Sequence, residues 1–334
     1  MLSDFIERDK RFDPFPPSKI PDANVKRVLL VVTTAHQKWR VDSYVDALRQ
    51  YSNVAVDIIR PTQEVLDEFP FELALRNYKT NPTGCDFSEL FERYDGFVLS
   101  GGRPNVMPEL YGEKPEFDKS VHDAARDYLS LGIVQQAPAK TPVLGICLGM
   151  QQMAVAFGAK LKKIDDHGPK DINDDKAYQP AHGIKIRSHT VLHVLQPTAG
   201  EVFGRKGAAE LTARTTARFK MPGKTVINSV HWRAIDEASI PPESHITVMA
   251  HAPDDTIEAI HIKHTNFIGV QNHPEKDVET NPHSRRLFAA FGMMLHGKLD
   301  LHEPAQFESF PKRFILRQRI AARSAWSRLV APRG

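Results

Sequence analysis

The sequence is poor in cysteine and has no long hydrophobic run. Its 334 residues include two cysteines, too few for a disulfide framework or for a zinc site built from cysteine alone. No stretch approaches the roughly 18 apolar residues that a bilayer-spanning helix needs. Residues 1–10 lack a basic segment followed by an apolar run, so we expect no secretory signal. These absences predict a cytoplasmic protein without a membrane span.

The chain also lacks a strong net charge. It has 44 Lys and Arg against 41 Asp and Glu, a formal net charge of +3. Residues 312–334 hold seven basic residues and no acidic one, so residues 1–311 carry +3 − 7 = −4. A mildly acidic body argues against nucleic acid as a partner.

What is present is an alternation of strand and helix patterns. Apolar, β-branched runs lie at 27–33, 54–59, 94–100 and 141–146, and helical periodicity covers 41–51, 118–136 and 150–157. Continuously apolar strands alternating with helices predict an α/β fold, with a mostly parallel central sheet flanked by helices. Short strands then follow over 183–272, and a last helix over 282–296. We predict an irregular lead-in (1–25), one α/β domain (26–297) and a basic C-terminal extension (298–334).

The most informative segment is Gly145–Gln151, which reads GICLGMQ. A strand ends there, Cys147 lies between near glycines, and a helix begins. This nucleophile-elbow arrangement exposes a side chain at the carboxyl edge of the sheet and needs small neighbours. The N-terminus of the following helix favours a negatively charged sulfur. The alternative is a buried, inert cysteine, but the flanking glycines favour a nucleophile.

A thiolate nucleophile needs a base, and the base needs a group that orients it. His273 follows the apolar run 267–270, so it would lie at the same sheet edge as Cys147. Glu275, two residues further on, can turn back to the imidazole, fix its tautomer and stabilise the imidazolium. We therefore predict a Cys147–His273–Glu275 catalytic triad.

A third strand end carries Leu99–Asn105, which reads LSGGRPN. Glycines at this position allow a backbone N–H to point into the site. Together with the N–H of Leu148, it could form an oxyanion hole for a tetrahedral intermediate. Arg103, beside the turn, is a candidate for binding a substrate carboxylate, and a solvated surface arginine is the alternative.

The histidines do not form a convincing metal motif. His261 and His264 are three residues apart, and His182, His189 and His193 lie upstream. In a strand, positions 261 and 264 point to opposite faces, whereas a metal site needs its ligands on one side. We predict no metal ion and no cofactor.

Together, the three motifs resemble those of the class I (triad) glutamine amidotransferase superfamily over about residues 26–297. Within it, the chain is most similar to the γ-glutamyl-γ-aminobutyrate hydrolase-like (peptidase C26) branch. The segments that carry this likeness are Arg103–Gly112, Asn228–His231 and Pro253–Ala259. The resemblance implies the flavodoxin-like fold of these enzymes, with Cys147 as nucleophile and His273 and Glu275 completing the triad.

The resemblance also implies roles for residues around the triad. The amides of Gly102 and Leu148 would stabilise the oxyanion. Gln151 and a strand formed by Ser229, Val230 and His231 would hold the α-amino and α-carboxylate groups of the glutamyl moiety.

Two activities are compatible with these motifs. The first is hydrolysis of a γ-glutamyl amide through a thioester, which releases glutamate and an amine. The alternative is a glutaminase subunit that uses glutamine and delivers ammonia to a separate synthase. Leu148 favours the alternative, because the hydrolase branch usually has arginine after the nucleophile.

The C-terminal extension alternates apolar residues with arginines over 314–329, a pattern compatible with a basic amphipathic helix. Such a helix could pack on its own domain. It could also dock to the second copy in a homodimer or to a synthase partner.

Overall fold

The computed structural model describes residues 6–8, 25–33, 38–61, 87–114, 122–168, 178–187 and 224–302. The predictions made for the C-terminal extension beyond residue 302 lie outside these residues, as do those for His189 and His193.

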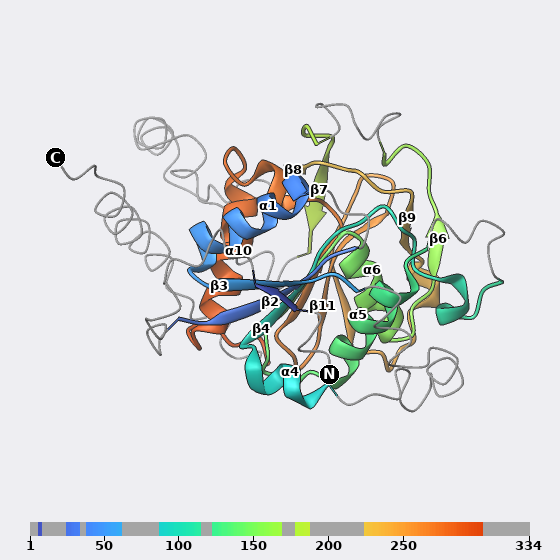
Figure 1. The fold of residues 1–334 in the computed structure, drawn as a ribbon. Helices are drawn as coiled ribbons and strands as arrows, with labels where there is room; N and C mark the ends of the chain where they lie inside the picture. Colours follow the sequence, from blue (N-terminus) through green and yellow to red (C-terminus); the bar gives the residue numbers. More distant parts are fainter. Residues whose placement is uncertain are drawn as a thin grey trace, which may run out of the picture.

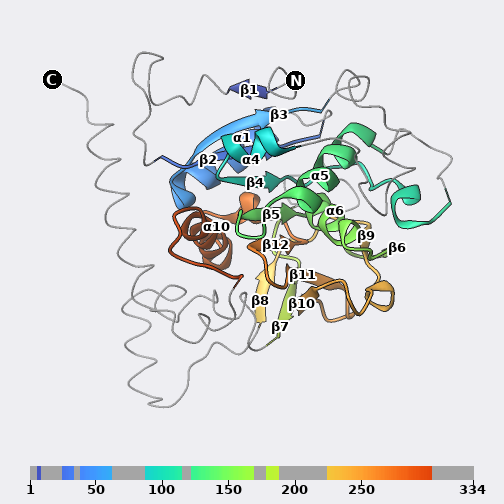
Figure 2. The ribbon, with the colours of Figure 1, turned by 90° about the horizontal axis from the view of Figure 1, so that it is seen from below.

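A ten-stranded sheet, counted over the described residues, runs through the molecule in the order β1-β3-β2-β4-β5-β12-β11-β10-β7-β8 (Figure 2). Its central strands pair in parallel, which confirms the predicted mostly parallel core. They are predominantly apolar because helices cover both faces of the sheet. These central strands are β3 (Ala55–Ile59), β2 (Arg27–Val31), β4 (Gly96–Leu99), β5 (Val143–Ile146) and β12 (Phe267–Val270).

The short strands of the second half extend this sheet in antiparallel fashion beyond β12. They are β11 (Ile257–Ile262), β10 (Ile246–His251), β7 (His182–Ile186) and β8 (Lys224–Ile227). At the opposite edge, β1 (Ile6–Arg8) pairs antiparallel with β3. A separate two-stranded ribbon joins β6 (Leu161–Lys163) and β9 (Arg233–Ile235).

Helices cover the parallel strands from both sides (Figure 1). The core cluster on one face contains residues of α1 and α10, and the cluster on the other contains residues of α4, α5 and α6. Strand β2 contributes Val28 and Leu30 to the first cluster and Leu29 and Val31 to the second, as a strand buried on both faces must. The helices are α1 (Lys38–Ala47), α4 (Ser88–Arg93), α5 (Ala124–Gln136), α6 (Leu148–Ala156), α9 (Pro274–Asp277) and α10 (Pro282–Leu295).

Three predicted helices differ from the observed ones at their ends. The helix expected over 118–136 begins at Ala124, where the side chain of Asp123 accepts from the Arg126 N–H as an N-cap. The helix expected from residue 41 begins at Lys38 and changes after Ala47 to a π-helical turn, Leu48–Ser52. The helix expected from Met150 begins directly after Cys147. Within the described part of the chain, no helix has the length and apolarity needed to cross a membrane.

Candidate active site

Cys147 occupies the turn between β5 and α6. Its backbone has φ 51° and ψ −104°, an unusual conformation for a residue other than glycine. Its N–H donates to the carbonyl of Val270 on β12, 2.8 Å away. Gly149 makes the turn possible, because a Cβ there would lie 2.2 Å from the carbonyl oxygen of Leu99. The predicted strand–turn–helix geometry is therefore present, and it directs the Cys147 side chain to the carboxyl edge of the parallel sheet.

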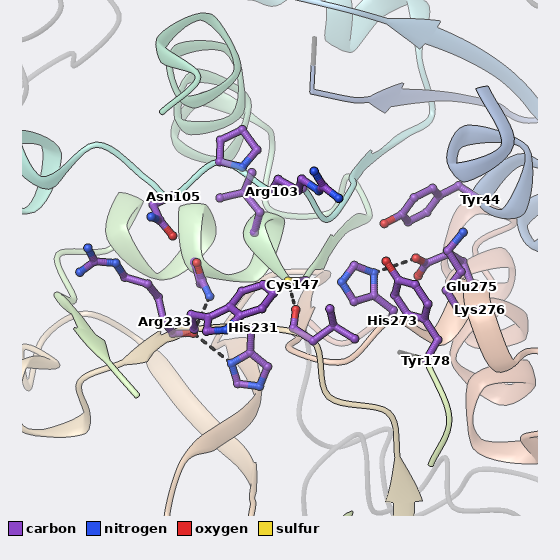
Figure 3. Close-up of a pocket in the computed structure, with 16 residues that line it drawn as sticks. Tyr44, Arg103, Asn105, Cys147, Tyr178, His231, Arg233, His273, Glu275 and Lys276 are labelled. Atoms are coloured by element: carbon purple, nitrogen blue, oxygen red, sulfur yellow. Dashed lines mark hydrogen bonds and ion pairs between the residues drawn. The ribbon is translucent and has the colours of Figure 1, made fainter. Parts of the chain in front are cut away.

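His273 follows β12 and lies at that same edge. Figure 3 shows its imidazole between Cys147 and Glu275, and its Nδ1 is 2.8 Å from Oε1 of Glu275. Burial alone would lower the pKa of His273, but the Glu275 carboxylate and the nearby Cys147 sulfur raise it well above its ordinary value. Burial opposes ionisation of Glu275 too, and His273 nevertheless lowers its pKa. The pair is thus electrostatically suited to hold an imidazolium beside the sulfur.

Asn228 fixes the backbone of His273, a contact that the sequence did not suggest. Its Nδ2 donates to the His273 carbonyl at 2.9 Å, and its Oδ1 accepts from the His273 N–H at 2.8 Å. These two hydrogen bonds hold Asn228 against the segment that follows β12. Residues 229–231 form a loop between β8 and β9, so our prediction of a strand there is wrong.

The Gly101–Gly102 turn closes the third side of the site. A Cβ on Gly101 would lie 2.4 Å from Cε1 of His273 and 3.2 Å from Cβ of Cys147, so a side chain cannot fit there. The Gly101 N–H donates to the hydroxyl of Tyr44 at 2.9 Å. A Cβ on Gly102 would lie 3.0 Å from Cδ2 of Leu148. The two residues predicted to supply oxyanion amides are therefore neighbours.

A buried arginine binds the backbone beside this turn. Arg126 on α5 is completely buried, and its guanidinium donates to the carbonyl oxygens of Val31 and Ser100, which end β2 and β4. Burial lowers the pKa of Arg126 to about 10, although Asp123 and Asp127 oppose the shift. The guanidinium remains cationic at neutral pH and joins two adjacent strand ends under the site.

An open groove surrounds Cys147. Nine of the ten residues predicted for the site line it. Ser229 does not, because its hydroxyl is buried and donates to the carbonyl of His167 at 2.7 Å. The lining consists of Tyr44, Gly102, Arg103, Pro104, Asn105, Cys147, Leu148, Gln151, Tyr178, Val230, His231, Trp232, Arg233, His273, Glu275 and Lys276.

Several groove residues were not predicted from the sequence, among them Tyr44, Tyr178 and Lys276. The ring of Tyr178 meets that of His273 edge-on, with centroids 5.4 Å apart, and Nζ of Lys276 lies 5.5 Å from the Tyr178 ring centre. Tyr44 belongs to α1, far from the motifs in sequence, and Tyr178 lies in a polar stretch. Neither position carries a local pattern that could have identified it.

A parallel α/β sheet whose adjoining strand ends carry a cysteine elbow, a histidine–glutamate pair and a diglycine turn defines a class I glutamine amidotransferase-like protein. The family model of Peptidase C26 matches residues 79–275, and the chain belongs to this family. Membership of a peptidase family identifies it as a hydrolase.

Curated relatives are consistent with this assignment. A glutamine amidotransferase-like protein, YvdE of Lactococcus lactis, is 30% identical over 59% of this chain and 72% of its own length. The γ-glutamyl-γ-aminobutyrate hydrolase PuuD of Escherichia coli is 27% identical over 61% of this chain and 72% of its own. Among solved structures, one described as a GMP synthase subunit of Thermoplasma acidophilum has a TM-score of 0.47 and 17% identity, covering 81% of this chain and 95% of that one.

Proposed function

We propose that this protein hydrolyses γ-glutamyl amides through a γ-glutamyl thioester on Cys147. The observation that carries the proposal is the placement of Cys147 at a strained elbow, beside the hydrogen-bonded His273–Glu275 pair and inside an open groove. Membership of Peptidase C26 and the name of the PuuD relative support the choice of bond.

The reaction needs two proton transfers, and His273 is the group that performs both. The Cys147 thiolate attacks the γ-carbonyl carbon, and the negative charge moves to the carbonyl oxygen beside the amides of Gly102 and Leu148. The imidazolium of His273 then protonates the departing amine as the C–N bond breaks. Water, deprotonated by neutral His273, attacks the thioester, and glutamate leaves as the C–S bond breaks. Glu275 holds the imidazole in place throughout.

The charges that line the groove suit a substrate with free carboxylates. Arg103, Arg233 and Lys276 are basic, whereas the one acidic residue, Glu275, is engaged by His273. Arginine and lysine both bind carboxylates by charge-assisted hydrogen bonds. Nε2 of Gln151 already donates to the Arg233 carbonyl at 2.8 Å. A substrate ammonium would therefore use the Gln151 carbonyl oxygen.

The second candidate is a glutaminase that supplies ammonia to a synthase. Leu148 favours it, because an apolar residue follows the nucleophile and its side chain packs beside Gly102. The chemistry at Cys147 would be the same, and only the leaving group would differ.

One experiment tests the chemistry and the subclass together. The purified protein is incubated with glutamine and a panel of γ-glutamyl amines, and release of glutamate is measured for wild type and Cys147→Ala. We expect rapid turnover of the amines and a loss of at least about 10⁴-fold in the variant, with an unchanged melting temperature. Slow glutamine turnover that rises many-fold with a synthase would favour the second candidate. Activity of Cys147→Ala within tenfold of wild type would reject both.

A further inference from the structure

Three buried side chains and one partly buried side chain converge next to the groove. Oε1 of Glu258 on β11 lies 3.5 Å from Nδ1 of His167, 3.5 Å from Nε2 of His182 and 3.7 Å from Nε2 of His231. The Glu258 side chain is 0% exposed, and the three histidine side chains are 6%, 18% and 2% exposed in the same order. Four segments that are distant in sequence thus meet at one carboxylate oxygen.

The atoms that face one another in this cluster lack hydrogen-bond partners. Within the described residues, neither oxygen of Glu258 has a partner, and the same holds for Nε2 of His182 and Nε2 of His231. Burying a carboxylate without a partner is costly. The protein atoms alone therefore leave the centre of the cluster unsatisfied.

The outer nitrogen of each ring is held by an acceptor. Nδ1 of His231 lies 3.0 Å from the Arg233 carbonyl, and Nδ1 of His182 lies 3.4 Å from the Gly183 carbonyl. A carbonyl only accepts, so each Nδ1 carries the proton and each Nε2 presents its lone pair toward Glu258. Such outer hydrogen bonds are typical of metal-ligating histidines because they fix the tautomer and the ring orientation.

His167 has the same arrangement with its nitrogens exchanged. Its Nε2 lies 2.9 Å from Oδ2 of Asp254, and its Nδ1 faces Glu258. A carboxylate behind the ligating histidine is a common feature of zinc sites.

We propose that His167, His231 and Glu258 bind one divalent transition-metal ion of the Zn²⁺ type. Their ligand atoms all lie within 4.8 Å of one another, and neighbouring donor atoms at a tetrahedral zinc ion with bonds of about 2.1 Å are about 3.4 Å apart. Two imidazoles and one carboxylate suit zinc, whereas Ca²⁺ and Mg²⁺ prefer oxygen ligands alone.

The ion would stabilise one wall of the groove. His231 lines the groove, and the carbonyl of Val230 lies 3.8 Å from Sγ of Cys147. By joining this loop to β11, the ion fixes residues that contact the nucleophile without entering the reaction. The proposal replaces our sequence-based expectation of no metal, which rested on the spacing of His261 and His264.

A proton on His167 is the competing way to satisfy Glu258. A doubly protonated ring would donate to Asp254 from Nε2, and its Nδ1 would face both Glu258 and Oγ of Ser229, which is 3.2 Å away. This state needs no ion and is expected to bind none, so measuring the metal separates the two.

The test measures metal content and stability, not activity. The purified full-length protein is analysed for zinc, stripped with EDTA, and titrated with ZnCl₂ while the melting temperature is recorded. We expect about one zinc per chain and a rise of about 5 °C at a hundredfold excess over Kd. Co²⁺ in place of zinc is expected to give visible d–d bands without a sulfur-to-cobalt charge-transfer band.

Matched variants locate the ion. Glu258→Gln and His167→Ala are expected to lose zinc, whereas His264→Asn, at an exposed turn, is expected to keep it. Cys147→Ala is expected to keep it too, which excludes binding at Cys147 and His273. The proposal is overturned if wild type binds no zinc above background, if zinc leaves its melting temperature unchanged, or if Cys147→Ala abolishes binding.

Discussion

At the scale of single residues, the site depends on positions where one atom more would displace the catalytic groups. Gly101 is the clearest case, because the space for its Cβ is taken by the imidazole of His273 and by Cys147. His273 cannot move aside freely, since Glu275 holds its ring and Asn228 holds its backbone. The glycine is therefore required by packing.

Gly101→Ala tests this packing. We expect kcat/KM to fall by about 100-fold or more, because a displacement of about 1 Å at reacting groups has that effect. Gly297→Ala is the control: its φ of 63° strains any side chain, but no atom lies within 4 Å of the added Cβ. This control should lose about 1 kcal/mol of stability and keep its activity. Equal activity in the two variants would contradict the packing argument.

Glu275→Gln tests the electrostatic role of the carboxylate. Glu275 raises the pKa of His273, so removing its charge lowers that pKa and makes the imidazolium lose its proton at lower pH. We expect the alkaline limb of the kcat/KM profile to move to lower pH, and kcat to fall by about 10²- to 10⁴-fold. The rate of Cys147 alkylation by iodoacetamide, measured against pH, should shift with it. An unmoved alkaline limb would show that Glu275 only packs against the ring.

At the scale of elements, local pattern predicted the parallel half of the sheet well. Each of its strands is predominantly apolar, and each motif lies where such a strand ends, so the meeting of Cys147, His273 and Gly102 follows from the topology of parallel strands. The antiparallel half carries equally clear strands. Their order is set by contacts between distant segments, and no local pattern shows that His167, His182 and Glu258 become neighbours.

A helix contact offers a test at this scale. Gly292 lies within α10, where alanine normally favours the helix by about 1 kcal/mol. Here a Cβ would lie 2.6 Å from Cα of Ser52 and 2.7 Å from its carbonyl oxygen, backbone atoms that cannot rotate away. Ser52 is also bound to α10, since its Oγ donates to the Phe288 carbonyl at 2.7 Å.

We therefore expect Gly292→Ala to destabilise the protein, although alanine in place of glycine usually stabilises a helix. The free energy of unfolding, measured by urea denaturation, should fall by about 1–3 kcal/mol because the helix is forced off the π-helical turn. An increase in stability would mean that α10 and residues 48–52 separate without cost.

At the scale of the whole molecule, two buried ionisable groups lie on opposite faces of the sheet. They change the stability of the folded protein in opposite directions as the pH is varied. Burial, assisted by Arg286, lowers the pKa of His283 on α10 to about 4. Burial raises the pKa of Asp127 on α5 to about 7, although hydrogen bonds from Gln152 and Met107 oppose the shift. Each group therefore remains neutral in the folded protein across a range where it is charged in the unfolded chain.

The signs of the two effects follow from which state binds more protons. Between pH 6.5 and 4, the unfolded chain protonates His283 and the folded protein does not, so this group makes stability fall on acidification. Between pH 4 and 7, the folded protein keeps a proton on Asp127 that the unfolded chain has released, so this group makes stability fall as pH rises. The His283 effect amounts to about 3 kcal/mol and the Asp127 effect to about 4 kcal/mol, so in the wild type they largely cancel.

Single and double variants should expose this cancellation. With EDTA present, so that metal release does not contribute, the free energy of unfolding is measured from pH 4 to 7.

In Asp127→Asn only the His283 effect remains, and stability should fall by about 3 kcal/mol toward pH 4. His283→Gln should give the opposite slope. Because the groups lie on opposite faces of the sheet, their effects should add, and the double variant should regain the shallow profile of the wild type. If the free energy of unfolding changes with pH at the same slope in all four proteins, neither group is held neutral in the folded state.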